Sequence, residues 1–431
     1  DARARRPGQP EGAVMALLDR ILRRGAPAEA DDGATRMHTW RYDRVLLAVT
    51  FALMGLGVVM IYSASIVSAE ARTGDGAFYL KRQIAYIGVA LMGLIAGLNI
   101  HHDLWRRLAR PAFIVAVLML MVVLVPGISA HAKGASRWID LGPFRFQPSE
   151  AVKLAWIVFL ARFLAARQHR VHELRATWGV PAMCLAGLGA LLMAQPDFGS
   201  TLICSGLMVL MIWAAGARWL HVGALFFAGA ALIPVAIIAE PYRIKRLLAF
   251  LDPENDPQGV AYHINQALIS FGSGDWTGMG LGGSRQKLLY LPEAHTDFIF
   301  SILGEELGVL GVALVITLFA IFVWRGFRIA RRAPSAFGAL LAFGLTAEIG
   351  FQAATNMAVA TALLPTKGLT LPFVSYGGSS ILLLGTSVGI LLNVSRGEPP
   401  PEWLHRFLPD ADVKARKVAR RAPAAAKEAA A

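Results

Sequence analysis

The chain has 431 residues, of which 55% are hydrophobic and only 16% are charged. Soluble domains usually carry about 25% charged residues, so this composition excludes an ordinary soluble protein and indicates a polytopic membrane protein. The formal net charge of +13 is better explained by lysine and arginine gathering in cytoplasmic loops than by nucleic-acid binding. Cys184 and Cys204 lie in apolar runs without the spacing of a metal site or a disulfide framework.

Both ends of the sequence are polar and basic. Residues 1–44 are rich in arginine and interrupted by Pro and Gly, unlike a cleavable signal peptide. Residues 395–431 finish in the basic, Ala-rich run RRAPAAAKEAAA, which is typical of disorder. We expect a cytoplasmic tail at each end and a membrane domain over residues 45–394.

Ten segments are apolar enough to span a bilayer, which takes about 20 residues each. They are 45–65, 80–99, 110–126, 150–166, 177–195, 199–217, 219–239, 298–324, 335–359 and 378–394. We therefore predict an all-α fold with about ten transmembrane helices and both termini in the cytoplasm. The loops at 99–110, 166–176 and 325–332 carry arginines, which places them on the cytoplasmic side. The loops 66–79, 127–149, 240–297 and 360–377 then face outward, and the long loop 240–297 before the eighth helix is predicted to be ordered and functional.

The first polar cluster begins the fourth predicted helix, in GASRWIDLGPFRFQPSEAVKLAW at 134–156. Glu150 and Lys153 lie three residues apart, on one helix face, where they can pair. Ionisable groups inside a membrane are functional candidates, although a structural ion pair at the helix mouth explains the same pattern. Arg145 and Gln147 add a cation and hydrogen-bond donors on the outer side, which favours a bound ligand.

Asp197 marks the second cluster, where QPDFGSTL separates two apolar runs. Its side chain could cap the sixth helix, because Asp accepts hydrogen bonds from the N–H groups at a helix start. It could equally line a polar cavity, and the sequence favours neither interpretation.

The third cluster is the outer loop, which carries several cations on a face that should contain few: Arg243, Lys245, Arg246, Arg285 and Lys287. Its glycines at 278, 280, 282 and 283 expose backbone N–H groups, but their spacing matches no known phosphate-binding motif, and flexible turns explain them as well. The loop ends in Glu293, His295 and Asp297 at alternate positions. In an extended segment these three side chains would lie on one side.

The fourth cluster, LLPTKGLTLPFVSYGGSS at 363–380, interrupts the connection between the last two helices with prolines and glycines. Irregular backbone near membrane depth needs shelter from protein or a watery cavity, which Lys367, Ser375 and Tyr376 would face. A tight loop with a snorkelling lysine is the alternative. Together the clusters predict one outer cavity for an anionic ligand, and a lipid-linked pyrophosphate fits better than a soluble ion.

Six motifs, in this order, resemble the SEDS proteins (shape, elongation, division and sporulation): MIYSAS, KRQ, RWI with FQPSEAVKL, QPDFGST, YLPEAHTDFIFSILGEELG and LPTKGLTLPFVSYGGSS. They are spread over residues 60–380, and PTKGLTLP resembles the division branch more than the elongation branch. The resemblance implies a peptidoglycan glycosyltransferase of the inner membrane that acts at the division septum. Its substrate would be lipid II, the undecaprenyl-pyrophosphate-linked disaccharide peptide. Its partners would be a class B penicillin-binding protein and other membrane proteins of the division machinery.

The resemblance also implies site residues. The family's catalytic aspartate corresponds to Asp297, and its Arg-x-Gln and Glu-x-x-Lys residues correspond to Arg145, Gln147, Glu150 and Lys153. The predicted substrate-binding set contains these four together with Asp197, Arg243, Lys245, Glu293, His295, Lys367 and Ser375. The two acids of GEELG, Glu305 and Glu306, have no assigned role.

The transfer of a sugar from a lipid-linked pyrophosphate requires a general base and nearby positive charge. A sugar hydroxyl is a poor nucleophile, and a positioned carboxylate base typically accelerates its attack by about 10²–10⁴-fold. Pyrophosphate leaves as an anion, so the site needs positive charge where a glycosidase needs a second carboxyl group. We predict that Lys and Arg side chains, with or without Mg²⁺ or Mn²⁺, hold the pyrophosphate and that no organic cofactor is used. A lipid II flippase and a non-catalytic scaffold are the competing functions.

Overall fold

The computed structural model describes residues 42–125, 129–132, 135–140, 142, 145–252, 259, 261–288, 290–366 and 368–397. Almost all of the two predicted tails, 1–44 and 395–431, and the whole of Lys367 therefore lie outside the described residues.

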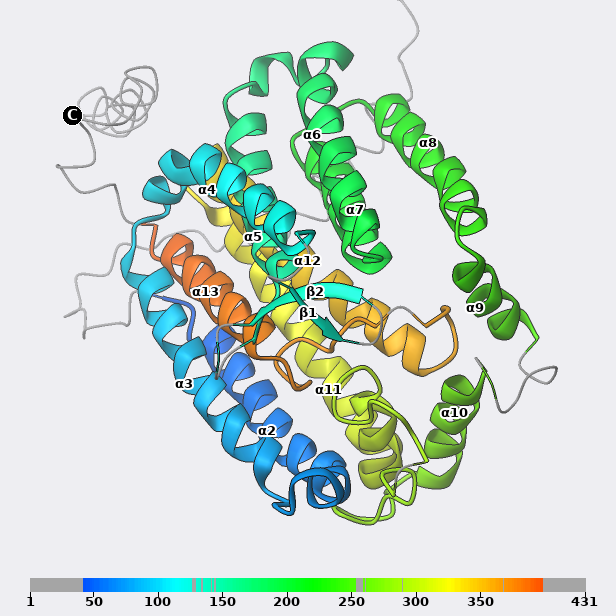
Figure 1. Ribbon diagram of the computed structural model, residues 1–431. Helices are drawn as coiled ribbons and strands as arrows, with labels where there is room; N and C mark the ends of the chain where they lie inside the picture. Colours follow the sequence, from blue (N-terminus) through cyan, green and yellow to red (C-terminus); the bar gives the residue numbers. More distant parts are fainter. Residues whose placement is uncertain are drawn as a thin grey trace, which may run out of the picture. The chain divides into compact units, whose positions relative to one another are not determined.

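Ten long helices within the described ranges correspond to the ten predicted spans (Figure 1). They are α2 (Arg44–Thr73), α3 (Phe78–Asn99), α4 (His102–Val123), α5 (Pro148–Ala165), α6 (Leu174–Ala194), α7 (Phe198–Ala214), α8 (Trp219–Ile238), α11 (Ile299–Arg332), α12 (Ala336–Ala360) and α13 (Gly378–Ser395). Seven helices are long and apolar enough to cross a membrane: α2, α3, Thr177–Ala194 of α6, α8, α11, α12 and α13. The protein is therefore a mainly helical, multi-pass membrane protein, and the number of ten crossings stays a prediction.

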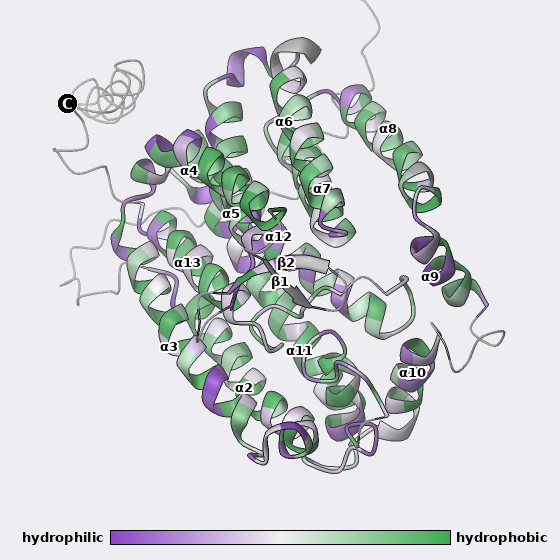
Figure 2. Ribbon diagram, viewed as in Figure 1, coloured by the Kyte–Doolittle hydropathy of each residue, from purple (hydrophilic) through white to green (hydrophobic). Residues whose placement is uncertain are grey.

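The remaining long helices fall short for visible reasons. Helix α7 is shorter, and both α4 and α5 contain several charged residues. Helix α5 packs against α4, α7 and α12, and most of its residues are buried. Its charges are therefore sheltered by protein. Figure 2 shows hydrophobic residues along most helices, with hydrophilic residues concentrated at helix ends and in α9 and α10.

The long outer loops contain ordered structure. Residues 240–297 include the short helices α9 (Pro241–Leu251) and α10 (Tyr262–Gly274). Residues 127–149 include an antiparallel sheet of β1 (Ser129–Ala132), β2 (Ala135–Asp140) and β3 (Arg145–Phe146), in the order β1-β2-β3. The all-α prediction thus missed a small sheet, because strands of two to six residues are too short to show a clear alternation of apolar and polar residues.

The arginine-bearing loops meet at one end of the helix bundle, which we call the arginine-rich end. There Asp43, before α2, pairs with Arg325 of α11 at 2.6 Å and donates its N–H to Ser395 of α13 at 3.1 Å. Arg162 of α5 donates to the carbonyl oxygen of Arg106 on α4. These loops were predicted to share a side, and they do. The opposite end, which we call the site end, holds the sheet, α9, α10 and the loops 291–298 and 361–377.

Glycines bring α3 and α13 into close contact. A methyl carbon added at Gly97 would lie 2.6 Å from the Thr386 carbonyl oxygen, and one at Gly389 would lie 2.2 Å from the Leu94 carbonyl oxygen. Small residues allow membrane helices to approach closely enough for efficient packing. This contact fixes α13, whose first residues carry part of the site.

Replacing Gly97 with alanine should push α3 and α13 apart. Overpacking of this kind typically costs about 1–3 kcal/mol, so we expect a lower thermal unfolding midpoint for the protein in detergent. Gly88→Ala, on the same helix, is the matched control, because an added methyl there meets nothing within 4 Å. It should leave the midpoint unchanged or slightly higher, since alanine favours helix. Equal losses in the two variants would contradict the packing argument.

Candidate functional site

A buried lysine lies near the start of α5. The Nζ atom of Lys153 is 2.9 Å from Glu150, as the three-residue spacing predicted, and 3.4 Å from Glu348 on α12. It also donates to Gln352 Oε1 at 2.6 Å. Sequence reasoning missed Glu348 and Gln352, although an acid within the ninth predicted span was a usable signal. Two carboxylates contact this one cation, so Lys153 is held firmly in place.

Two amide side chains of α12 connect this cluster to the loops of the site end. Gln352 Nε2 donates to the carbonyl oxygen of Thr370 at 3.0 Å. One turn further along, Asn356 Nδ2 donates to the carbonyl oxygens of Leu369 at 2.6 Å and of Asp297 at 2.9 Å. Helix α12 therefore holds the loop 361–377 and the candidate catalytic segment together.

Residues 291–298 form a series of turns and not the extended segment considered in the sequence analysis. Glu293 has a positive φ of 57°, and its carbonyl oxygen accepts from the Thr296 N–H at 3.1 Å. The condition under which Glu293, His295 and Asp297 would share one side, an extended segment, is therefore not met. Backbone turns override the alternation of side chains that a strand would give.

The three ionisable side chains have different surroundings. Glu293 accepts a hydrogen bond from the hydroxyl of Thr296 at 2.9 Å. His295 is buried, and its ring centre lies 4.5 Å from that of Tyr79. Asp297 is partly buried and faces the loop 361–377, because a methyl carbon added at Gly368 would lie 3.4 Å from its Oδ2 atom. Asp297 thus lies beside Gly368, in the glycine-containing part of this loop.

Ser375 joins the two loops. Its hydroxyl donates to the Thr296 carbonyl oxygen at 2.6 Å and accepts from the Leu371 N–H at 2.8 Å. The next residue, Tyr376, donates its N–H to the His295 carbonyl oxygen at 3.0 Å. Burial, with the neighbouring Tyr86, raises the pKa of Tyr376 above its ordinary value, so its phenol stays neutral. These residues fix the backbone around Asp297.

Arg145 and Gln147 lie beside the first turn of α13. The Ser379 hydroxyl donates to the Arg145 carbonyl oxygen at 2.9 Å and accepts from the Gln147 N–H at 2.9 Å. The Arg145 guanidinium is exposed, 3.6 Å from Asp140. The main chain is therefore fixed, and the cation is accessible to an anion.

Asp197 caps α7. Its carboxylate accepts from the N–H of Ser200 at 3.1 Å and from the Ser200 hydroxyl at 2.8 Å. The preceding turn is held by Arg137, which donates to the carbonyl oxygens of Gln195 and Pro196. The capping interpretation accounts for this side chain, and its role as a substrate ligand stays a prediction.

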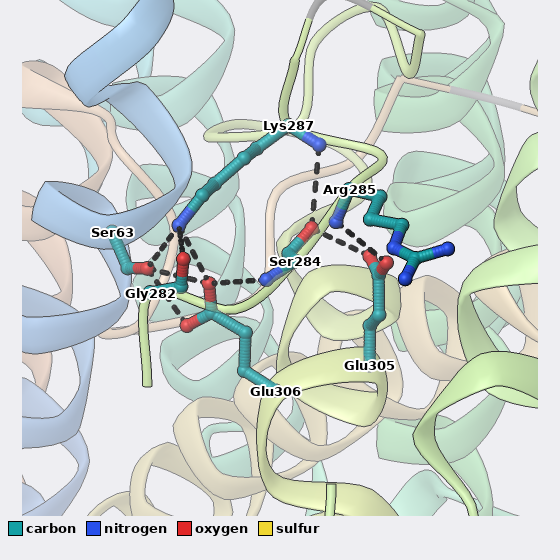
Figure 3. Close-up of polar contacts among 7 residues, drawn as sticks. All are labelled: Ser63, Gly282, Ser284, Arg285, Lys287, Glu305 and Glu306. Carbon is teal, nitrogen blue, oxygen red and sulfur yellow. Dashed lines mark hydrogen bonds and ion pairs between the residues drawn. The ribbon is translucent and has the colours of Figure 1, made fainter. Parts of the chain in front are cut away.

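The cations of the outer loop divide into engaged and accessible ones. Arg243 is buried, and its guanidinium donates to the Ala236 carbonyl oxygen at 2.7 Å. Lys287 is also buried, paired with Glu306 at 3.1 Å (Figure 3). Lys245 is exposed on α9.

Arg246 brings α9 close to the loop that contains Lys367. Its Nη1 atom donates to the carbonyl oxygen of Thr366 at 3.3 Å, and its side chain is exposed. Arg246 belongs to the predicted loop cations but not to the predicted substrate-binding set. Its position beside this loop makes it a better candidate than the buried Arg243.

Among the described residues, one group of three side chains could hold a metal: His101, His102 and Asp103. It lies at the arginine-rich end, away from Asp297. Mg²⁺ is usually bound by one or two carboxylates together with substrate phosphates. A divalent cation at the site end therefore stays a prediction.

Comparisons with known proteins agree on one family. A family model for FtsW, RodA and SpoVE, described as "Cell cycle protein", matches residues 43–399. The chain is 45% identical to "Probable peptidoglycan glycosyltransferase FtsW" of Trichlorobacter lovleyi, over 83% of this chain and 93% of that protein. It is 41% identical to "Stage V sporulation protein E" of Bacillus subtilis, over 82% of this chain and 97% of that protein.

Solved structures show the same likeness. One is a chain from the structure described as "Structural coordination of polymerization and crosslinking by a peptidoglycan synthase complex". It has a TM-score of 0.68 and 30% identity, and the match covers 82% of this chain and 98% of that chain. The rod shape determining protein RodA of Thermus thermophilus has a TM-score of 0.61 and 28% identity, over 84% of this chain and 98% of that chain.

Replacing Lys153 with methionine should destabilise the protein strongly, because Glu150 and Glu348 would lose the cation that both contact. Breaking a buried ion pair typically costs about 3–5 kcal/mol. Adding Glu348→Gln should recover part of the loss, which thermal unfolding in detergent would measure. Lys81→Met is the control, since Lys81 pairs with Asp75 while 69% exposed, and such pairs contribute about 0–1 kcal/mol. Equal effects of the two lysine changes would be inconsistent with this role of Lys153.

Proposed function

Because this chain belongs to the FtsW/RodA/SpoVE family of cell cycle proteins, we propose that it is a peptidoglycan glycosyltransferase with Asp297 as its general base. The activity is the one named for its FtsW relatives, which it matches over most of their length. One observation carries the assignment of the site: the Asp297 carboxylate faces the loop 361–377 at the end of the bundle where accessible cations gather.

The base activates the acceptor sugar. The acceptor hydroxyl attacks the anomeric carbon of the donor, and its proton passes to the Asp297 carboxylate. The oxygen–carbon bond forms as the bond to pyrophosphate breaks, with inversion at carbon. A fixed carboxylate favours this step only if it is held within hydrogen-bond reach of the hydroxyl. The bonds from Asn356 and Ser375 to the backbone of residues 296–297 provide that fixation.

The leaving pyrophosphate requires positive charge. Arg145, Lys245 and Arg246 have exposed side chains at the site end, and Lys367 belongs to the loop that Arg246 contacts. Positive groups aimed at a leaving anion stabilise the charge that develops in the transition state. A divalent cation bound to the pyrophosphate would supply further charge of the same kind.

The position of Asp297 at the site end also bears on the substrate and on the orientation of the protein in the membrane. We propose that lipid II serves as both donor and acceptor, because a polar disaccharide must reach Asp297 while its lipid stays in the membrane. We propose that the arginine-rich end faces the cytoplasm and that the site end faces the outer side of the inner membrane. The family resemblance supports the division septum as the place of action. The structural relative from a peptidoglycan synthase complex supports a class B penicillin-binding protein as the partner.

A lipid II flippase is the second candidate. The buried cluster of Lys153, Glu150 and Glu348 favours it, since transporters place charges inside their helix bundles. A flippase has no need for a carboxylate held at the outer end beside exposed cations. The two functions separate in detergent, where transport is impossible.

Asp297→Ala and Asp297→Asn should abolish glycan synthesis from lipid II by the purified protein with its partner. The expected loss is about 10²-fold or more, because the base is removed while the binding cations remain. Gel analysis of labelled glycan chains measures it. Unchanged elution and thermal unfolding would show that the fold is intact.

The matched control for Asp297 is Asp75→Asn. Asp75 is an acid between α2 and α3 that pairs with an exposed lysine, and its replacement should leave synthesis unchanged. Full glycan synthesis by Asp297→Asn would contradict the assignment of Asp297 as the general base. Absence of synthesis in the unaltered protein, together with lipid II movement in vesicles, would favour the flippase.

A further inference from the structure

Helix α11 is broken at Gly308. This residue has φ 62° and ψ −163° inside an otherwise helical run. A first segment, Ile299–Leu307, is thereby separated from the rest of the helix. In a continuous helix the carbonyl oxygens of Glu305 and Glu306 would accept from the N–H groups of Val309 and Leu310, and the break leaves all four groups without those partners.

A segment of the outer loop fills the break. The N–H groups of Met279 and Gly280 donate to the carbonyl oxygens of Glu305 and Glu306, both at 3.0 Å. In return, Val309 donates to the Asp275 carbonyl oxygen at 3.0 Å and Leu310 to that of Trp276 at 3.2 Å. The loop thus replaces both missing helical hydrogen bonds, and all four backbone groups have partners within the protein.

The insertion requires glycine on both sides. Gly278 has φ 80°, and a methyl carbon there would lie 2.1 Å from the Glu306 carbonyl oxygen. A methyl carbon at Gly308 would lie 2.4 Å from the Gly278 nitrogen. Part of the glycine-rich stretch is therefore explained by the close approach of two backbones, without any need for a phosphate.

The two acids of GEELG hold the inserted loop through their side chains (Figure 3). Glu306 accepts from the Ser63 hydroxyl at 2.6 Å and pairs with Lys287 at 3.1 Å. Lys287 Nζ also donates to the carbonyl oxygen of Gly282 at 2.6 Å. Ser63 belongs to α2, so the cluster connects three segments that are far apart in the sequence.

Glu305 completes the contact. Its carboxylate accepts from the Ser284 hydroxyl at 2.5 Å and from the Arg285 N–H at 2.8 Å (Figure 3). Glu305, Glu306, Ser284 and Lys287 are all buried. A buried ion pair is weak evidence for stability, because apolar packing of similar volume often serves as well. Directional bonds instead fix one arrangement of the loop against α2 and α11.

The short segment Ile299–Leu307 is consequently held at both ends. At its start, Asn356 binds the carbonyl oxygen of Asp297 at 2.9 Å. At its end, about 13 Å along the axis at 1.5 Å per residue, Glu306 binds Ser63 and Lys287. The break at Gly308 removes the stiffness that the remainder of α11 would otherwise provide.

We propose that Ser63, Lys287 and Glu306 are positioning residues for Asp297. This inference rests on the proposed glycosyltransferase function. The cluster sets the axial position and rotation of Ile299–Leu307, and this segment sets where the Asp297 carboxylate meets the acceptor hydroxyl. None of the three residues contacts the reacting atoms in this proposal.

The main test uses Ser63→Ala, which removes one hydroxyl and is expected to fold. A misplacement of about 1 Å can cost about 10²-fold in rate, so a partial release should lower kcat by about tenfold. KM for lipid II should stay unchanged, because the accessible cations are not altered. Ser68→Ala on the same helix is the matched control, since the Ser68 hydroxyl donates to the Ser65 carbonyl oxygen of its own helix at 2.9 Å.

Lys287 provides a second, independent variant. Lys287→Met should lower kcat further than Ser63→Ala, and Lys287→Arg should retain more activity than Lys287→Met, because it keeps a cation beside Glu306. Hydrogen–deuterium exchange gives a readout independent of activity. The amides of Met279, Gly280, Val309 and Leu310 should exchange faster in both Ser63→Ala and Lys287→Met, while those of α13 should not.

Two outcomes separate the proposals. If the unaltered protein with its partner makes no glycan from lipid II, the glycosyltransferase function fails. If it does make glycan, and folded Ser63→Ala and Lys287→Met keep its kcat, the positioning role fails. A loss of activity that comes only from a higher KM would also overturn the inference. Faster exchange without any change in kcat would do the same.

Discussion

The structure depends on one constraint: backbone groups that leave regular helix within a membrane protein need partners inside the protein. The site end contains several such stretches, including the loop 361–377, the turns at 291–298 and the break at Gly308. Polar side chains of neighbouring helices satisfy them. Gln352 and Asn356 of α12 bind the first two, and the loop after α10 satisfies the third. The irregular backbone is therefore firmly positioned.

The same constraint sorts the charges. Lys153 and Lys287 are buried, and each is paired with carboxylates, because an unpaired buried charge costs several kcal/mol. They order helices and loops and add little attraction for an anion. Arg145, Lys245 and Arg246 have exposed side chains and are suited to bind one. A count of cations in the sequence cannot make this distinction, because it depends on which acid each cation meets in the fold.

The sequence predicted what depends on local composition. The ten apolar segments, the common end of the arginine-bearing loops and the Glu150–Lys153 pair all follow from hydropathy and helical spacing. It could not predict that Glu348 joins that pair, because the two helices meet through tertiary packing. The alternating acids and histidine of residues 291–298 also allowed an extended segment. The structure instead forms turns there, with a positive φ at Glu293. The roles of Glu305 and Glu306 could not be predicted from the sequence either. Their partners lie on α2 and in the inserted loop, which meet α11 only through tertiary packing.

The break in α11 also allows the two parts of that helix to follow different directions, which their separate contacts require. Its second part is tied to the arginine-rich end, where Arg325 pairs with Asp43. Its first part must present Asp297 at an angle set by α12 and the loop 361–377. A continuous helix would pass any tilt of one end to the other, because hydrogen bonds run through its whole length. Gly308 permits two directions in one helix. The inserted loop and the Ser63–Lys287–Glu306 cluster then restore the rigidity that the break removes, so the base can be held independently of the distant end.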